Sequence, residues 1–149
     1  MAKKVLALDY DDEALHHART YYNAENVQFQ QADLNHVLSL ESNCFDLVVS
    51  FETIEHLYQQ EQLVKEFHRI LRPGGVLIMS TPNGTVTGLA NEPPNPFHVH
   101  ELSCRELSDI LKRNSLTLEA LFGQWRYGHI EKPSIVRSKG FKSALNAVY

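Results

Sequence analysis

The chain has 149 residues, of which 43% are hydrophobic and 21% charged, and its formal net charge at pH 7 is −4. This length suits one domain over residues 1–149, and the charge provides no general attraction to nucleic acid, although a local basic patch would still allow it. No apolar run approaches the roughly 18 residues of a membrane span, and Met1–Lys4 leads into a strand-like segment instead of a signal peptide. We therefore predict a cytoplasmic protein without a membrane span.

A strand and a helix are predicted at the start of the chain. Residues Val5–Leu8 form an unbroken apolar run, which predicts a buried strand that ends at Asp9. The acidic run Asp11–Glu13 places negative charge at the start of the next helix, where the helix dipole favours it. The inward stripe of that helix is predicted to consist of Leu15, Ala18, Tyr21 and Tyr22.

Asp9 lies where a nucleotide ligand would meet the first predicted strand. In α/β nucleotide-binding folds, an acidic residue at a strand end binds the ribose, because one carboxylate accepts two vicinal O–H groups. Asp9, followed by Tyr10, is therefore a candidate ribose contact. A solvated aspartate at a strand end is the alternative interpretation.

A second strand also ends at an acidic residue. Val27–Gln31 alternates between apolar and polar side chains, which predicts a strand near the edge of a sheet. It is followed by Asp33 and Leu34, which repeat the pattern of Asp9. Asp33 would also cap a short segment over Asn35–Leu40, and we predict a short helix or a loop over residues 35–43.

The middle of the chain predicts a β-α-β unit. Phe45–Ser50 and Val76–Thr81 are apolar runs rich in β-branched residues, which is typical of strands covered on both faces. A helix is predicted between them, and Pro73–Gly75 ends it. The apolar stripe of this helix consists of Leu63, Val64, Phe67, Ile70 and Leu71.

Three ionisable side chains follow the first strand of this unit. Glu52, Glu55 and His56 would share one face if the segment forms a helical turn. Ligands of open α/β sheets bind at the carboxyl ends of the strands, so these side chains are candidate site residues.

The rest of the chain predicts one helix between less regular segments. Residues 84–100 are rich in turn formers and are interpreted as a lid-like loop. Ser103 and Glu106 fit a capping box, which predicts the start of a helix. The buried stripe of this helix is predicted to be Leu107, Ile110 and Leu111. Leu116–Phe122 alternates and predicts a strand at an edge of the sheet, and residues 123–149 form a tail without a dependable pattern.

Three of these stretches together resemble one family. Phe45–Ser50, Glu52–Leu57 and Arg69–Asn83 are similar, in order and spacing, to the fourth through fifth strands of class I S-adenosylmethionine-dependent methyltransferases. The resemblance implies an α/β, Rossmann-like fold with a mostly parallel sheet flanked by helices. It also implies the cofactor S-adenosyl-L-methionine and the transfer of its methyl group to an acceptor, for which a small molecule is the favoured class.

The resemblance also implies roles for individual residues. The cofactor would lie against Asp9, Tyr10, Asp33, Leu34, Ser50 and Phe51. Asp33 would accept a hydrogen bond from the adenine amino group. Glu55 and His56 would be the catalytic residues, either as base or as ligand for an acceptor hydroxyl, amine or carbon acid.

The family's first strand and its glycine-rich turn are not found in this sequence. Val5–Asp9 matches the family's second strand, and none of the seven glycines precedes Gly74. We therefore expect a fold truncated at its N-terminus, without the backbone amides that hold the methionine part of the cofactor. Such a chain would bind the cofactor weakly by itself, and its open strand edges would favour self-association.

Several explanations of this gap stay open. The chain is a fragment of an active enzyme, a non-catalytic methyltransferase-like interaction module, or one of two chains that complete the sheet together. A nicotinamide-dependent oxidoreductase is a further alternative, because buried strands and Asp9 suit that fold too. It fits less well, since Arg72–Gly75 has no part in a dehydrogenase and the dehydrogenase glycine fingerprint is not found here.

Glu52, Glu55 and His56 also resemble a known arrangement of metal ligands. Ubiquinone-biosynthesis O-methyltransferases and small-RNA 2′-O-methyltransferases hold a divalent cation with a similar Glu-x-x-Glu-His. By this resemblance, Glu52, Glu55 and His56 would be ligands, and His100, or else His98, would be the fourth. Such an oxygen-rich set would favour magnesium or manganese over zinc. Many small-molecule methyltransferases use a similar Glu-His pair without a metal, and that is the interpretation we favour.

Overall fold

The computed structural model describes residues 2–88 and 95–123. Four strands and five helices follow in the order β1 (Val5–Asp9), α1 (Asp12–Tyr21), β2 (Val27–Gln31), β3 (Phe45–Phe51), η1 (Ile54–His56), α2 (Gln60–Ile70), β4 (Leu71–Ser80), α3 (Gly84–Thr87) and α4 (Cys104–Arg113). No helix in this described part is both long and apolar enough to cross a membrane. The predicted tail, apart from residue 123, lies outside the described residues.

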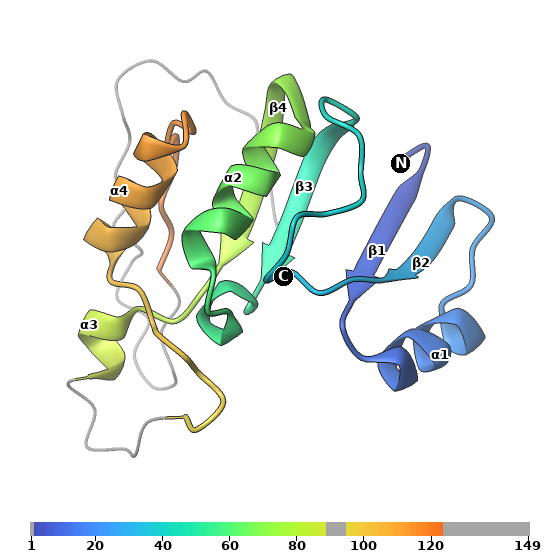
Figure 1. The fold of residues 1–149 in the computed structure, drawn as a ribbon, viewed down its shortest axis with the longest axis horizontal. Helices are drawn as coiled ribbons and strands as arrows, with labels where there is room; N and C mark the ends of the chain where they lie inside the picture. The colour runs from blue at the N-terminus through green and yellow to red at the C-terminus, as the bar shows by residue number, and fades with distance from the viewer. Residues whose placement is uncertain (1, 89–94, 124–149) are drawn as a thin grey trace.

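The strands pair in two parallel sheets, one of β1 with β2 and one of β3 with β4 (Figure 1). The predicted parallel pairing of β3 with β4 is therefore confirmed, with Leu47 opposite Val76 and Phe51 opposite Ser80. β4 begins earlier than predicted because it continues directly from α2 and bulges after Leu71, where Gly74 has a φ of +81° that suits glycine. Within the described residues, no strand joins the two sheets.

One face of the β3–β4 sheet carries the core. Val48, Leu77 and Met79 pack against a buried cluster formed by η1, α2 and α4. The members of this cluster are Ile54, Leu57, Leu63, Val64, Phe67, Leu102, Ile110 and Leu111. The prediction of the helix beginning at the capping box of Ser103 and Glu106 is also confirmed.

The opposite face of this sheet is half exposed, so the prediction of burial on both faces is wrong. The exposed side chains are Leu47 at 49%, Val49 at 51%, Val76 at 51% and Ile78 at 43%. Alternate residues of a strand point to opposite faces, and in Figure 1 α2 lies over only one face of the sheet. An apolar run shows that a strand is suited to burial on both faces. It does not show that a helix or another strand is present to cover each face.

Three other predictions are corrected. Tyr21 and Tyr22 are about two-thirds exposed, because α1 buries only Leu15 fully and Tyr21 stacks on His17 instead. Leu116–Phe122 is not a strand: its first amide bonds back to the end of α4, and no strand pairs with it in the described part of the chain. The predicted loop 84–100 contains the short helix α3, and residues 89–94 are outside the described ranges.

A buried ion pair fixes the segment between β2 and β3. Glu66 is 3% exposed and bonds to Arg69 with Nη2···Oε2 at 2.7 Å, and it also accepts from the backbone amide of Leu38 at 2.9 Å. Arg69 donates to the carbonyl oxygens of Leu38 and Leu40. The guanidinium of Arg69 is the main reason that the pKa of the Glu66 carboxyl lies below its ordinary value. The residues 35–43, which form turns and not a helix, are thus held against α2.

We predict that Glu66→Gln destabilises the fold at neutral pH by about 2 kcal/mol, because one amide cannot replace the ion pair and its backbone bond. Since the folded-state pKa of Glu66 is lowered, its contribution is complete above the unfolded-state pKa and is lost as pH falls through the folded-state pKa. Urea unfolding at pH 7 and pH 3 measures this. Glu61→Gln, which breaks an exposed pair with Arg113, is the control and should cost clearly less stability than Glu66→Gln, because solvent screens an exposed pair. An equal loss for Glu66→Gln at both pH values would contradict the argument.

Candidate functional site

The carboxyl ends of β1 and β2 bring the two predicted cofactor carboxylates to one sheet edge. Asp9 is the last residue of β1, and its carbonyl accepts from the amide of Ala32, just before Asp33. The Asp9 carboxylate accepts from the amide of Asp11 at 2.9 Å, and its side chain otherwise faces solvent. Tyr10 is 71% exposed beside it. A ribose would meet an open carboxylate here.

Asp33 is held in place by its own turn. Its Oδ1 accepts from the backbone amide and the side-chain amide of Asn35, at 2.9 and 3.1 Å, and His36 lies 3.4 Å from Oδ2. The backbone bond from Asn35 is the main reason that the pKa of the Asp33 carboxyl lies below its ordinary value. The two bonds from Asn35 therefore orient the carboxylate, and the next residue, Leu34, is half-buried.

The end of β3 is pinned to β4 by an unusual residue. Glu52 has a φ of +47°, which residues other than glycine seldom adopt. Its amide donates to the Ser80 carbonyl at 3.0 Å, and Ser80 Oγ donates to its carboxylate at 2.6 Å. Before it, Ser50 is buried and Phe51 is 57% exposed at the same strand end. Glu52 therefore precedes the helical turn that we predicted it to share with Glu55 and His56, and that prediction is wrong.

Glu55 is a fully buried carboxylate with one oxygen unpartnered. It lies in η1 at 0% exposure; Oε2 accepts from Thr81 Oγ1 at 3.0 Å, whereas Oε1 has no hydrogen-bond partner. A carboxylate so placed requires compensation by a donor or a positive charge, because burial removes its hydration. Its backbone carbonyl accepts from the amides of Val99 and His100, which fixes the later segment against η1.

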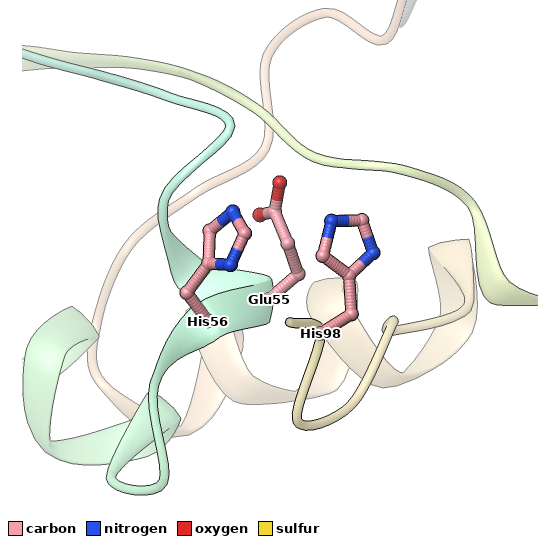
Figure 2. Close-up of side chains that lie close together, drawn as sticks. All are labelled: Glu55, His56 and His98. Atoms are coloured by element: carbon pink, nitrogen blue, oxygen red, sulfur yellow. The ribbon is translucent and has the colours of Figure 1, made fainter. Parts of the chain in front are cut away.

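Two imidazole rings flank this carboxylate, as Figure 2 shows for Glu55, His56 and His98. Their ligand atoms all lie within 4.8 Å of one another, and the ring centroids of the two histidines are 4.8 Å apart. His56 Nδ1 lies 3.0 Å from the Phe97 carbonyl oxygen, to which only an N–H can donate. The proton of neutral His56 is therefore on Nδ1, and Nε2 keeps its lone pair.

His98 has the same tautomer for a similar reason. Its Nδ1 lies 2.5 Å from a carboxylate oxygen of Glu101, and the Asn95 amide nitrogen donates to its Nε2 at 3.0 Å. Glu101 also accepts from Thr87 Oγ1 of α3. The hydrogen bond from Thr87, followed by that from His98, holds the pKa of the Glu101 carboxyl below its ordinary value. The proton of neutral His98 is thus on Nδ1, and its lone pair, on Nε2, accepts from Asn95.

α3 supports this segment through a close backbone contact. The Gly84 amide donates to the Leu102 carbonyl at 3.1 Å, and a Cβ at Gly84 would lie 2.1 Å from the Glu101 carbonyl oxygen. Only glycine fits there. The contact keeps Glu101 where it can bond both Thr87 and His98.

The predicted metal ligands are only partly brought together. Glu55 and His56 do lie together, but the third member is His98 and not His100. His100 Nε2 lies 3.5 Å from a Glu106 carboxylate oxygen, and Glu52 bonds to Ser80. The four-ligand, oxygen-rich set implied by the resemblance therefore does not fit this structure. Two imidazole nitrogens and one carboxylate form the cluster instead.

Glu101, which bonds to His98, was not among the site residues predicted from the sequence. The spacing His98-x-x-Glu101 was the available signal, because side chains three residues apart often meet in turns, as these two do.

Comparisons with known proteins agree on one family. The family model described as a methyltransferase domain matches residues 1–79. A protein of Mycolicibacterium smegmatis named as a probable S-adenosylmethionine-dependent methyltransferase is 39% identical over 124 residues, which are 83% of this chain and 47% of that protein. A Mycobacterium tuberculosis protein named in the same way is 41% identical over 112 residues, 74% of this chain and 40% of its own. The chain thus spans less than half the length of these relatives.

Solved structures give the same fold. An S-adenosylmethionine-dependent methyltransferase from Mesorhizobium loti superposes with a TM-score of 0.65 at 21% identity, over 83% of this chain and 66% of that one. Another from Thermotoga maritima gives a TM-score of 0.67 at 18% identity, over 94% and 79% of the two chains. At such identities the likeness concerns the Rossmann-like fold alone.

We predict that Glu55→Gln stabilises the metal-free protein by about 1 kcal/mol, because an amide N–H in place of Oε1 can donate to an imidazole lone pair. Urea unfolding in the presence of EDTA measures the change. Glu52→Gln, which keeps the exposed bond to Ser80, is the matched control and should change stability by less than about 0.5 kcal/mol. A loss of stability for Glu55→Gln would show that the buried carboxylate is already compensated.

Proposed function

Because the chain belongs to the class I S-adenosylmethionine-dependent methyltransferase family, we propose that it provides the adenosine-binding and acceptor-activating parts of an enzyme that methylates a small molecule. The observation that supports this most is that Asp9 ends β1, Asp33 follows β2 and His56 follows β3. In Figure 1 the arrows of β1 and β3 point in the same direction, so these ends lie toward one side of the fold.

Asp9 and Asp33 would hold the adenosine part of the cofactor. The open carboxylate of Asp9 suits the two ribose hydroxyls, and ionised Asp33 suits the adenine amino group. When bound there, S-adenosylmethionine would supply an activated methyl group, and its carbon–sulfur bond would break as the acceptor forms its bond to the methyl carbon, with S-adenosylhomocysteine as the leaving group. The chain itself mainly positions the reactants and excludes water.

His56 would take the proton that the acceptor loses. Its Nδ1 is engaged by the Phe97 carbonyl, so the unprotonated Nε2 is the atom able to accept a proton from a hydroxyl or amine. Glu55 would stabilise the imidazolium that forms, since a carboxylate oxygen of Glu55 lies within 4.8 Å of a ring nitrogen of His56. None of these steps uses a bound cation.

Binding of S-adenosylhomocysteine tests this function against its rivals. We expect weak binding, above micromolar Kd, in saturation-transfer NMR, because the glycine-rich turn of the family is not among these residues. NADH should not bind. Binding of NADH would favour the oxidoreductase, and binding of neither would favour an interaction module.

We predict that Asp33→Asn weakens S-adenosylhomocysteine binding about tenfold, because one hydrogen bond to a charged group is replaced by a bond to a neutral amide. Competition NMR with adenosine as reporter measures it. Asp12→Asn, in the exposed first turn of α1, is the matched control and should leave the affinity unchanged. Equal effects of the two variants would remove Asp33 from the cofactor site.

A further inference from the structure

We propose that one face of the β3–β4 sheet packs against the same face of a second copy of the chain. Leu47, Val49, Val76 and Ile78 form this face, which we call the aliphatic face. The proposal does not depend on methyl transfer. It also differs from association through open strand edges, because the contact is made by side chains and leaves the strand edges free.

The aliphatic face is a continuous block of four side chains. Leu47 lies opposite Val76, and Val49 lies opposite Ile78. Partners in a parallel register point to the same side of a sheet, and successive side chains of one strand point to opposite sides. The four aliphatic side chains are therefore neighbours, and each of them is between 43% and 51% exposed.

No element in the described part of the chain covers the aliphatic face. Figure 1 shows α2 over the opposite face of the sheet, and the buried cluster lies on that same side. The four side chains therefore keep apolar surface in contact with water, which is unfavourable. A contiguous apolar patch of this kind commonly marks a contact surface, whereas single exposed apolar residues do not.

The charges around the aliphatic face favour an apolar partner. Neither Leu47–Phe51 nor Val76–Ser80 contains an ionisable side chain. Asp46, just before the first of these stretches, bonds to Arg72 at 2.6 Å, so these two charges compensate each other. A charged partner would lose hydration here without gaining an ion pair. A second copy presents an equally uncharged face, and an isologous contact brings the same residues together from both sides.

The size of the aliphatic face sets the strength of the contact. At the observed exposed fractions, its four side chains leave on the order of 300 Å² of apolar surface uncovered. Two copies would bury about twice this area through these side chains, which is below the roughly 1,200 Å² of a standard stable interface. We therefore expect a weak, reversible dimer and not an obligate one.

The side chains of this face suit the packing of one sheet on another. Val49, Val76 and Ile78 are β-branched and have few rotamers, so they lose little conformational entropy when a contact forms. Two twisted sheets stack with their strands about 30° apart and about 10 Å between them. In a twofold arrangement, each substitution on the face would enter the interface twice.

Sedimentation equilibrium of the full chain tests the proposal. We expect a reversible monomer–dimer equilibrium with a Kd on the order of 100 μM, as for other small interfaces. Val49→Lys should abolish the dimer, because it would place one uncompensated charge from each copy in the contact. Val37→Lys is the matched control, since Val37 is 68% exposed and lies outside the face, and it should dimerise as the unchanged chain does.

A second measurement locates the contact. In a sample that mixes isotope-labelled with unlabelled chains, filtered NOEs should connect methyl groups of Leu47, Val49, Val76 and Ile78 between copies. Intermolecular NOEs confined to other methyl groups, such as those of Val37, would overturn the proposal.

Three sedimentation results would also overturn it. These are a monomer at every concentration, whether the face stays open or another segment of the chain covers it; a dimer that Val49→Lys leaves unchanged, which would assign association to the strand edges; and an equal loss in Val49→Lys and Val37→Lys. Circular dichroism shows whether each variant is folded. If Val49→Lys unfolds, the double variant Val49→Thr, Val76→Thr decides, because threonine is isosteric and β-branched. It should weaken the dimer at least about tenfold, and an unchanged Kd would refute the interface.

Discussion

The parallel register of β3 with β4 is the constraint on which the site depends. Phe51 pairs with Ser80, so the residues that follow each strand emerge at the same edge. Glu52 and η1 follow β3, and Thr81 follows β4, which is how Thr81 Oγ1 reaches the carboxylate of Glu55. A parallel pair requires a crossover, and α2 provides it while burying its apolar stripe on the sheet.

Glu55 joins three segments that are distant in sequence. Its backbone carbonyl accepts from the amides of Val99 and His100, its side chain accepts from Thr81, and a carboxylate oxygen lies within 4.8 Å of a ring nitrogen of both His56 and His98. A buried carboxylate of this kind is costly to the fold in the absence of a compensating charge. An apolar residue would pack in η1 without this desolvation cost. A buried carboxylate that lowers the stability of the fold is therefore an argument for a functional role of Glu55.

The sequence predicted the positions of helices and strands better than it predicted which of their side chains are buried. The positions of β1, β2 and β3, the capping box of Ser103 and the pairing of β3 with β4 depend on local pattern, and these are confirmed. Burial of both sheet faces and of Tyr21 failed because burial depends on which other element covers a residue. The strand at Leu116–Phe122 failed because alternation does not provide a pairing partner.

The same distinction applies to the site. Glu55 and His56 were predicted from spacing and lie together, as adjacent residues on one turn must. His98 and His100 are equivalent in sequence, and only the turn bonded to the Glu55 carbonyl decides which ring enters the cluster. The left-handed backbone of Glu52, which removes its carboxylate from that turn, has no signal in the sequence either.

The two sheets carry different parts of the proposed site. Asp9 ends β1 and Asp33 follows β2, whereas His56 follows β3, and no strand hydrogen bond joins the two sheets within the described residues. Methyl transfer requires the acceptor, the methyl carbon and the sulfur in line, and a shift of about 1 Å can cost about a hundredfold in rate. Each half of the site is locally well ordered by its own hydrogen bonds. The rate would therefore be set by whatever fixes β1 relative to β3, and substitutions at that boundary should affect turnover more than the affinity for either ligand.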